Sequence, residues 1–369
     1  MIFYIYLGYP ALVFLLSVVV NRGVKKDGYE PAVTILISAF NEESVIENTL
    51  KNKLDLNYPE EKLGIIVISD GSTDGTDEIV NRYRDKRVRL IRQEPRSGKT
   101  AALNLAVPEA EGEILIFSDA NSIYDPQALR KLIRNFIDPA VGYVTGKMIY
   151  VHPDGSPIGD GCSAYMKYEN RLRSWETAIG SVVGVNGGID AVRKELYRPM
   201  NPDQLPDFVL PLKVAEQGYR VVYEPEAILN EYSLKSSTDE YKMRVRVGLR
   251  SLWALWDMRN LLSFSSSGLF TWQLWSHKVL RYLCFIFLIS AFFTNLALWS
   301  DSPVYKILFL AQCIAYLGAI ASLVWERKNH QSKILYLPYY FALLNLASVH
   351  AFAKFIMGQK MVTWTPRKG

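Results

Sequence analysis

Carboxylate, amide and ammonium groups recur directly after short apolar stretches in the first third of the chain. Oxygen ligands of this kind suit Mg²⁺ or Mn²⁺, and a lysine beside them can donate to a phosphate group. Any one such residue is explained equally well by a helix cap or a tight turn. Four successive places of this kind predict a binding site. The residues concerned are Asn41 with Glu42, Asp70, Lys99, and Asp119 with Asn121.

These residue types meet the needs of a transfer reaction that starts from a nucleoside diphosphate. Asp70 could bond a base edge or a ribose hydroxyl, and Lys99 could donate to the nucleotide. A metal ion at Asp119 would neutralise the charge that develops on the departing diphosphate. The acceptor hydroxyl would need a carboxylate as general base. Asp207, in LPDFVLPLKVAEQGYRVVYEP, is available for that task, although a helix cap is an alternative role for it.

Two other nucleotide-binding motifs are excluded by spacing. SGKT, at positions 97–100, ends like a P-loop, but that motif requires Gly five residues before Gly98, where Gln93 stands. No GxGxxG follows the first apolar stretch, so a dinucleotide-binding fold of the dehydrogenase type is not expected.

The apolar stretches before these residues alternate with helical patterns. Near-continuous apolar strands separated by helices predict a parallel sheet that is covered on both faces. Ligands bind such sheets at the carboxyl ends of the strands, where the polar residues stand. The predicted strands cover residues 33–40, 63–70, 88–93 and 113–121.

Apolar segments at both ends of the chain predict a membrane protein. Residues 2–20 carry no charge, and as a helix they would extend about 28 Å, which is close to the hydrocarbon thickness of a bilayer. Residues 261–281 mix aromatic and polar side chains, as an amphipathic helix at the membrane surface would. Three further apolar runs follow at 282–299, 305–325 and 334–357. The predicted division is a transmembrane helix over 1–22, a catalytic domain over 28–258, an interfacial helix over 259–281, and membrane segments with a cytoplasmic tail over 282–369.

Charge indicates orientation and compartment. NRGVKK follows the first apolar run, which predicts an outside N-terminus and a catalytic domain in the cytoplasm of a multi-pass protein of the cell membrane. The segment 334–357 either spans the membrane or lies in the interface, and a basic tail inside the cell favours the interface. The net charge of +5, with Lys and Arg beside the apolar runs, favours anionic lipid over nucleic acid. Three widely spaced cysteines fit a reducing compartment.

The order of the motifs resembles family 2 glycosyltransferases of the GT-A fold, the group that includes cellulose, hyaluronan and poly-N-acetylglucosamine synthases. The resemblance covers roughly residues 31–250. AFNEE begins at Ala39, DGSTDGT at Asp70 and SGKTAALNLA at Ser97, and SDAN stands where the family has its metal motif. Farther on, VNGGIDAVRKELY resembles the acceptor-side segment, and the stretch around Asp207 resembles the segment with the catalytic base.

This resemblance implies an α/β GT-A domain with added membrane helices, a Mg²⁺ or Mn²⁺ ion, and a nucleotide-sugar donor, with UDP-sugars favoured. The acceptor would be lipid-linked or a glycan, and the reaction a single inverting displacement with Asp207 as base. The implied nucleotide-binding residues are Ala39, Asn41, Glu42, Asp70, Lys99 and Asp119, and the metal ligands are Asp119 and Asn121. On the acceptor and diphosphate side the implied residues are Gly187, Gly188, Arg246, Arg250 and Trp364, although Trp364 is equally explained as an interface anchor.

Three departures from the family pattern bear on function. Asn121 replaces a carboxylate of the metal motif, and Pro206 stands where an acid normally precedes the base. The Gln-x-x-Arg-Trp signature of processive synthases is reduced to Arg246 followed by Val247. We therefore expect a membrane-bound transferase, with a processive polysaccharide synthase as the first alternative. A non-catalytic membrane protein that keeps the nucleotide-sugar fold is the second.

Overall fold

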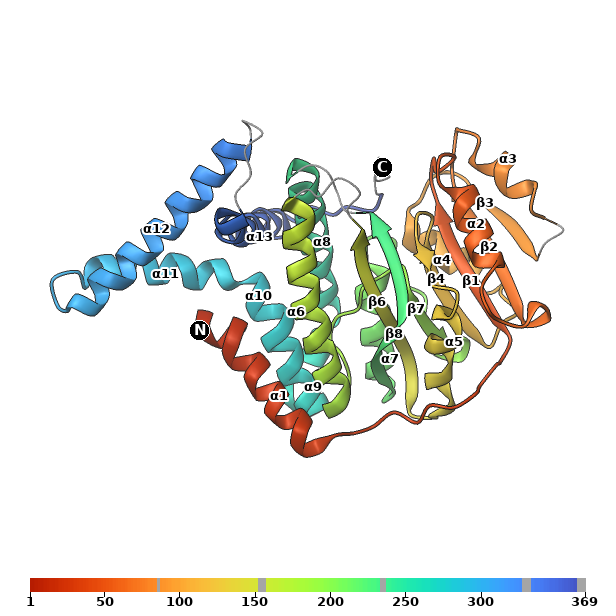
Figure 1. Ribbon diagram of the computed structural model, residues 1–369, viewed down its shortest axis with the longest axis horizontal. Coiled ribbons are helices and arrows are strands. Elements are labelled where there is room, and N and C mark those ends of the chain that lie inside the picture. Colours follow the sequence, from red (N-terminus) through yellow and green to blue (C-terminus); the bar gives the residue numbers. More distant parts are fainter. Residues whose placement is uncertain (85–86, 152–156, 233–236, 327–332, 364–369) are drawn as a thin grey trace.

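A computed structural model describes residues 1–84, 87–151, 157–232, 237–326 and 333–363 of the chain. Its centre is an eight-stranded sheet with the order β3-β2-β1-β4-β7-β6-β8-β5. The strands are β1 (Val33–Ala39), β2 (Leu63–Asp70), β3 (Val88–Gln93), β4 (Ile114–Asp119), β5 (Ile123–Tyr124), β6 (Val141–Val151), β7 (Asp190–Arg193) and β8 (Arg220–Tyr232). Figure 1 shows the sheet in the right half of the molecule, with the apolar helices projecting to the left.

The first four strands form the parallel half of the sheet, as the sequence predicts. β1 pairs in parallel with β2 and with β4, and β2 pairs in parallel with β3. Ala39 lies opposite Ser69, and Asp70 lies opposite Gln93, so the carboxyl ends of these strands meet at one edge. The polar residues that follow the strands are thereby brought together at that edge.

The second half of the sheet is mixed. The short strand β7 lies antiparallel between β4 and β6, and β8 runs parallel to β6. The register of β6 and β8 shifts twice, once between Val141 and Tyr143 and once between Thr145 and Lys147. Asp190, the first residue of β7, lies opposite Phe117 of β4 and Thr145 of β6. The insertion of β7 thus brings Asp190, from a later part of the chain, next to the carboxyl end of β4.

Helices cover both faces of the sheet, and each face has its own apolar core. One core joins the sheet to α2 (Ile46–Leu54), α3 (Thr76–Asn81) and α5 (Ala128–Ile133). The other joins it to α4 (Lys99–Ala106), α7 (Pro206–Glu216), α8 (Ser237–Asp257) and α9 (Phe264–Leu274). Short helical turns complete this part at η2 (Glu60–Lys62), η3 (Arg134–Ile137), η4 (Lys194–Leu196) and η5 (Arg259–Leu262).

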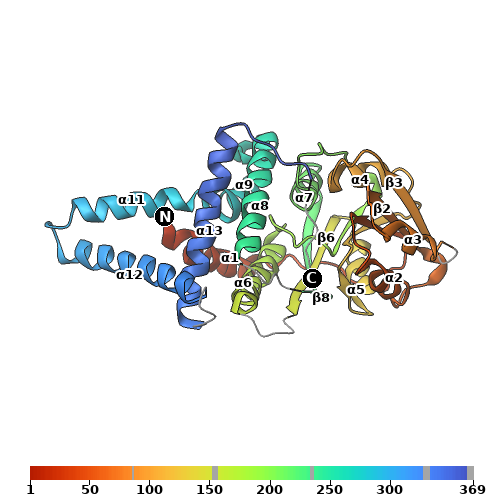
Figure 2. The same ribbon diagram turned by 90° about the horizontal axis from the view of Figure 1, so that it is seen from above.

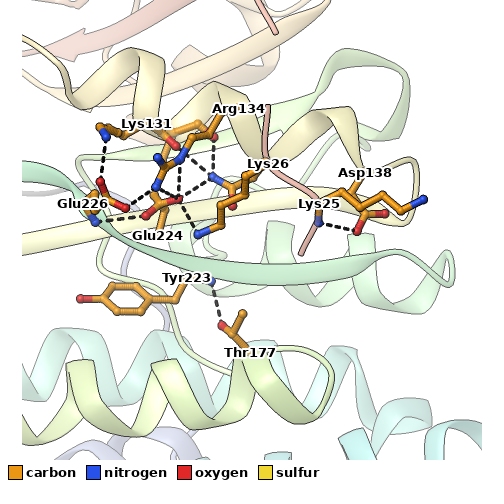
Figure 3. A network of polar contacts seen from close by, with 11 residues as sticks. Lys25, Lys26, Lys131, Arg134, Asp138, Thr177, Tyr223, Glu224 and Glu226 are labelled. Atoms are coloured by element: carbon orange, nitrogen blue, oxygen red, sulfur yellow. Dashed lines mark hydrogen bonds and ion pairs between the residues drawn. The ribbon is translucent and has the colours of Figure 1, made fainter. Parts of the chain in front are cut away.

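The segment that joins the N-terminal helix to β1 is held by ion pairs (Figure 3). Lys26 Nζ lies 2.9 Å from Oε2 of Glu224, a fully buried residue of β8. Arg134 Nη2 donates to the same oxygen at 3.1 Å, and Asn135 Nδ2 donates to it at 3.0 Å. The backbone amide of Lys25 donates to Asp138. Because Glu224 is buried, its charge requires these donors. Their contacts hold the segment before β1 against the sheet.

The N-terminal helix packs against the catalytic domain. It comprises η1 (Tyr4–Gly8) and α1 (Tyr9–Val20), and it lies along α6 (Pro157–Ile179). The Tyr9 hydroxyl donates to Glu176 Oε1 at 2.5 Å. His277, in η6 (Trp275–Val279), lies between Glu176 and Glu169 at 2.7 and 3.0 Å. This buried polar cluster joins three helical segments far apart in the sequence, so only the outer face of α1 is exposed.

The apolar runs in the last third of the chain form helices. They are α10 (Leu280–Tyr282), α11 (Cys284–Ala297), α12 (Pro303–Glu326) and α13 (Lys333–Ile356). Two stretches, Pro303–Ser322 and Pro338–Ile356, are long and apolar enough to cross a membrane. A third qualifies if Gly268–Tyr282 and Cys284–Ala297, which are bent by 61°, form one broken span. Residues 4–20 form a shorter apolar helix.

The arrangement of these helices separates α13 from the other two. Figure 2 shows α11 and α12 side by side, projecting away from the sheet, with α13 lying across them. α13 packs along α8 of the catalytic domain. The contact with α8 is compatible with an interfacial position for the last apolar run, and its length and composition are equally compatible with a span, so both predictions stand. The predicted interfacial helix at 259–281 is broken into η5, α9, η6 and α10, and Leu261, Leu274 and Val279 lie in the core shared with α7.

A tight contact where the chain enters β4 gives a stability prediction. A methyl group at Gly112 would lie 2.5 Å from the backbone nitrogen of Thr34, whereas one at Gly64 would be 3.9 Å from its nearest neighbours. Gly112→Ala should therefore destabilise the protein by about 1–3 kcal/mol, because backbone atoms of β1 would have to move. Gly64→Ala is the matched control. Thermal unfolding of both variants in detergent checks this, and equal melting temperatures would contradict it.

Candidate active site

Asp70 lies at the carboxyl end of β2 and is fully buried. Oδ1 accepts hydrogen bonds from Gln93 Nε2 at 2.5 Å and from the amide of Ser97 at 2.7 Å. Oδ2 accepts one from the amide of Gly98 at 3.0 Å, and Arg96 Nε lies 3.7 Å away. Both oxygens are therefore engaged with the loop before α4. This arrangement favours a role in shaping the nucleotide loop over direct bonding to a ribose.

The loops after β1 and β2 are joined by reciprocal hydrogen bonds. The amide of Thr73 donates to Asn41 Oδ1 at 2.8 Å, and the amide of Asn41 donates to Ser72 Oγ at 3.1 Å. The amide of Glu42 donates to Thr76 Oγ1 at 2.9 Å. Ala39, also predicted to bind the nucleotide, is fully buried at the end of β1. These hydrogen bonds thus join the two predicted nucleotide loops to each other at the strand ends.

Two side chains of helix α2 form hydrogen bonds with the backbone of the predicted metal motif. Thr49 Oγ1 donates to the carbonyl of Ala120 at 2.6 Å, and Lys53 Nζ donates to the carbonyl of Ser122 at 2.6 Å. Lys53 is completely buried and lies over the Tyr124 ring. Burial lowers the pKa of Lys53 well below its ordinary value, with Asp119 opposing the shift. These contacts fix the backbone between Asp119 and Tyr124, so the Asp119 side chain projects from a rigid loop.

One ammonium group stands among three carboxylates. Lys99 Nζ, at the start of α4, forms an ion pair with Asp119 Oδ1. Burial disfavours its charge, but the fields of Asp119, Asp207 and Asp190 outweigh that effect and raise the pKa of Lys99. The four residues come from β4, α4, β7 and α7, and they meet at the edge of the sheet where the parallel strands end.

Gly187 and Gly188 separate Asp207 from Asp119. Both glycines have positive φ angles, of 70° and 69°, which residues with side chains rarely adopt. A methyl group at Gly187 would lie 2.7 Å from Asp207 Oδ2, and one at Gly188 would lie 3.0 Å from Ser122 Oγ and 3.4 Å from Asp119 Oδ2. The absence of side chains here lets the backbone pass directly between the predicted base and the predicted metal ligand.

Asp207 occupies the first turn of α7. A carboxylate near a helix N-terminus is stabilised by the free amides of that turn. Its Oδ1 is buried and has no hydrogen-bond partner among the described residues. A buried carboxylate oxygen that lacks a donor carries a desolvation cost, which a substrate hydroxyl could remove.

Asp190 is a site residue that the sequence analysis did not single out. Burial raises its pKa to about 7; the charge of Asp207 adds to the shift, while Thr145, Lys99 and Tyr143 oppose it. Its Oδ1, like Ser122 Oγ, has no partner in the described part of the chain. The sequence did contain a signal for Asp190, because this acid follows the pair Gly187 and Gly188 by two residues and begins a buried strand.

The two predicted arginines lie on α8. Burial lowers the pKa of Arg246, while Asp207 and Asp119 oppose that shift, so Arg246 lies within electrostatic range of both. Arg250 is instead buried in a structural position, where its guanidinium donates to Thr100 Oγ1 at 3.2 Å and to carbonyls of residues 202–204. Burial lowers its pKa to about 10. Trp364 lies outside the described residues. Two further acids of α6, Glu169 and Glu176, are engaged by His277.

The segment after α13 returns to the nucleotide loop. Lys360 Nζ lies 2.5 Å from Asp203, and Trp253 Nε1 donates to the carbonyl of Gln359 at 2.8 Å. A methyl group at Gly98 would lie 2.8 Å from the carbonyl oxygen of Val362. The chain beyond the last apolar helix therefore lies on the catalytic domain, beside the start of α4.

The ends of the parallel strands bring Asp70, Lys99 and Asp119 together. The mixed half of the sheet adds Asp207 at the start of α7. This arrangement is that of a GT-A glycosyltransferase domain. Residues 34–192, just under half of the chain, match the model of glycosyl transferase family 2. The chain thus carries a family 2 glycosyltransferase domain.

Curated relatives agree with this assignment, and a solved structure has the same fold. The chain is 31% identical over 222 residues to a poly-β-1,6-N-acetyl-D-glucosamine synthase of Staphylococcus aureus, covering 58% of this chain and 53% of the relative. It is 28% identical over 232 residues to the probable glycosyltransferase YdaM of Bacillus subtilis, covering 58% and 54%. The chain spans about half the length of these relatives. The mannosyltransferase PcManGT of Pyrobaculum calidifontis, solved with GDP-Man and Mn²⁺, has the same fold, with a TM-score of 0.74, 22% identity and 97% coverage of each chain.

The raised pKa of Asp190 predicts a pH-dependent stability. A carboxyl group with a folded-state pKa near 7 and an ordinary value of 3.8 stabilises the fold below about pH 4, and this contribution is lost as the pH rises through 7. Asp190→Asn should therefore be more stable than the wild type at pH 8, by at most about 4 kcal/mol, and close to it at pH 4. The exposed Asp55→Asn is the control. Melting temperatures across this range test the prediction, and a constant difference between variant and wild type would refute it.

Proposed function

We propose that the protein is a membrane-bound, inverting glycosyltransferase that moves a sugar from a nucleotide-sugar donor to a membrane-associated glycan or lipid. The observation that carries this proposal is the meeting of Asp119, Lys99 and Asp207 around Gly187 and Gly188 at the strand ends. The family 2 domain match supports the reaction type, and the helices of membrane-spanning length support the location.

In the proposed reaction, Asp207 accepts the proton of the acceptor hydroxyl, and the hydroxyl oxygen attacks the anomeric carbon. Its unpartnered Oδ1 is suited to accept that hydrogen bond. The bond from the anomeric carbon to the diphosphate breaks as the new bond forms. Arg246 and Lys99 lie close enough to the reaction centre to stabilise the negative charge that develops on the leaving diphosphate.

A divalent ion, Mg²⁺ or Mn²⁺, fits the residues at the end of β4. Asp119 is partly exposed and already attracts the Lys99 ammonium group, and Asn121 can offer a carbonyl oxygen two residues later. No group of three His, Cys, Asp or Glu side chains in the described chain could hold a metal alone. Asp119 and Asn121 would therefore supply the oxygen ligands that the protein contributes to the ion. Such an ion neutralises charge on the leaving group.

Two questions about the proposed reaction are open to experiment: which nucleotide sugar is the donor, and whether the enzyme transfers one sugar or builds a polymer. A UDP-sugar is favoured by resemblance to the synthases, whereas the structural neighbour PcManGT holds GDP-Man. A thermal-shift panel of UDP-, GDP- and dTDP-sugars separates these donors, because a ligand that binds the folded state raises the melting temperature. Product length distinguishes a single transfer from processive synthesis. Val247, in place of the aromatic residue of processive enzymes, favours a single transfer.

The assignment of the base predicts the effect of Asp207→Asn. This change keeps the volume of the side chain but removes its basicity, so turnover should fall by roughly 10²-fold or more while donor binding is kept. Glu216→Gln, at the exposed far end of the same helix, should have normal turnover. Sugar transfer from radiolabelled donor measures both variants, and an Asp207→Asn enzyme with normal turnover would move the base elsewhere.

The metal assignment predicts the effect of Asp119→Ala. This variant should fold and lose both sugar transfer and the metal-dependent part of donor binding, because the ion would retain only a neutral ligand from the protein. EDTA should inactivate the wild type, and added Mn²⁺ or Mg²⁺ should restore activity. Donor-induced thermal shifts with and without metal provide the readout. Full wild-type activity in EDTA would exclude the metal role.

A further inference from the structure

The apolar helices enclose a groove beside the catalytic domain. It has a volume of about 750 Å³ and lies between α11, α12 and α13, at the start of α8. Its lining is almost wholly apolar and includes Phe285, Leu288, Phe292, Ala315, Ala342 and Leu346. Leu346 and Ile320, which line the groove, are 61% and 59% exposed, and Leu317 of α12 is exposed to a similar extent. Because α12 and α13 have the length and composition of membrane helices, this groove would face acyl chains rather than water.

A small basic cavity continues the groove toward the catalytic domain. It has a volume of about 110 Å³ and shares Asn345 with the groove. Four cationic or ionisable side chains line it, namely Arg244, His277, Lys278 and Arg281. An apolar groove that leads into a basic cavity is complementary to a lipid with an anionic headgroup.

Lys278 is the cation of this cavity that lacks a protein partner. Arg244 pairs with Glu240 at 2.8 Å, Arg281 pairs with Glu169, and His277 lies between two glutamates. Lys278 has neither a hydrogen bond nor an ion pair in the described part of the chain, although most of its surface is covered. The charges of Glu169 and Glu176 act on it from a distance, but both carboxylates are already engaged by His277 or Arg281. A largely buried ammonium group that contacts no carboxylate of its own is costly, and a ligand that brings negative charge would reduce this cost.

The position of Lys278 connects this cavity to the reaction centre. Its Nζ lies 5.8 Å from the centroid of the Phe208 ring, and Phe208 directly follows Asp207. A methyl group at Gly184 would overlap Nζ, so the ammonium also touches the segment that leads to Gly187. A headgroup held at Lys278 would therefore lie against the first turn of α7, the turn that carries the predicted base.

We propose that the groove and Lys278 together bind the lipid anchor of the acceptor, with a long apolar chain between α11, α12 and α13 and a phosphate group at Lys278. This inference rests on the proposed function and specifies its acceptor as a phosphate-bearing lipid. The polar remainder of the acceptor then extends toward Asp207.

Hexadecyl phosphate is a suitable probe, with hexadecanol and inorganic phosphate as comparisons, and native mass spectrometry of the full chain from detergent measures binding. The wild type should bind hexadecyl phosphate more tightly than either comparison. Lys278→Met should weaken hexadecyl phosphate binding by about tenfold or more, because a charge-assisted contact is lost, and it should leave hexadecanol binding unchanged. Lys278→Arg should keep the preference for the phosphate.

Two further variants test the groove and the specificity. Ala342→Trp should fill the groove and weaken the binding of hexadecyl phosphate and hexadecanol alike. Lys306→Met, on α12 away from both cavities, should behave as the wild type. Equal affinity of wild type and Lys278→Met for hexadecyl phosphate would overturn the proposal. Equal affinity of the wild type for hexadecyl phosphate and hexadecanol, or an Ala342→Trp variant with unchanged affinity, would also do so.

Donor binding separates this test from the test of the proposed function. The nucleotide-sugar thermal shift should be the same in wild type and Lys278→Met, which also shows that the variant is folded. A shift lost only in Lys278→Met would assign the lysine to the donor and overturn the lipid proposal. A wild type that binds hexadecyl phosphate but no nucleotide sugar would instead defeat the proposed function and leave the lipid site standing.

Discussion

Lys99 is the cation on which the charge balance of the catalytic centre depends. Three carboxylates, Asp119, Asp190 and Asp207, act on its ammonium group at the sheet edge. Buried like charges can share such a place only if a cation offsets them or if one of them keeps its proton. The raised pKa of Asp190 reflects the second solution, and the ion pair between Lys99 and Asp119 reflects the first. A donor that arrives with phosphate groups and a cation enters a centre whose charges are already closely matched.

The parts of the fold that could be predicted are those whose signal is local. Strands β2 and β3 have the predicted bounds, because buried parallel strands appear in sequence as continuous apolar runs that stop at polar residues. Asp119 could be singled out because it ends such a strand, and Asp207 because it begins a likely helix. Asp190 could not be, since its importance arises from β7 being inserted between β4 and β6. The saturation of Asp70 by loop amides is likewise invisible in sequence, because it depends on the fold of the loop before α4.

Hydropathy gave a simpler picture of the apolar helices than the structure does. Residues 2–20 contain no charge, and composition alone indicates a lone apolar helix. The structure nevertheless places the Tyr9 hydroxyl on Glu176, inside the cluster around His277. The partner of a tyrosine within an apolar run lies more than a hundred residues away, so no local pattern could reveal it. Residues 259–281 show the same effect, since their apolar side chains are largely used to complete the core beneath α7.

Because of that shared core, the catalytic domain cannot be separated cleanly from the helices that follow it. Leu261, Leu274 and Val279 follow the predicted end of the catalytic domain, yet they belong to one apolar cluster with Phe208 and Leu210 of α7. A fragment that ended before α9 would leave the helix bearing Asp207 with an uncovered apolar face, and such surfaces promote aggregation. Limited proteolysis should accordingly find few sites between α8 and α10, whereas the α11–α12 hairpin could be cut or exchanged at less expense to the fold. The smallest autonomous unit thus extends beyond the family 2 domain and includes η5, α9 and η6.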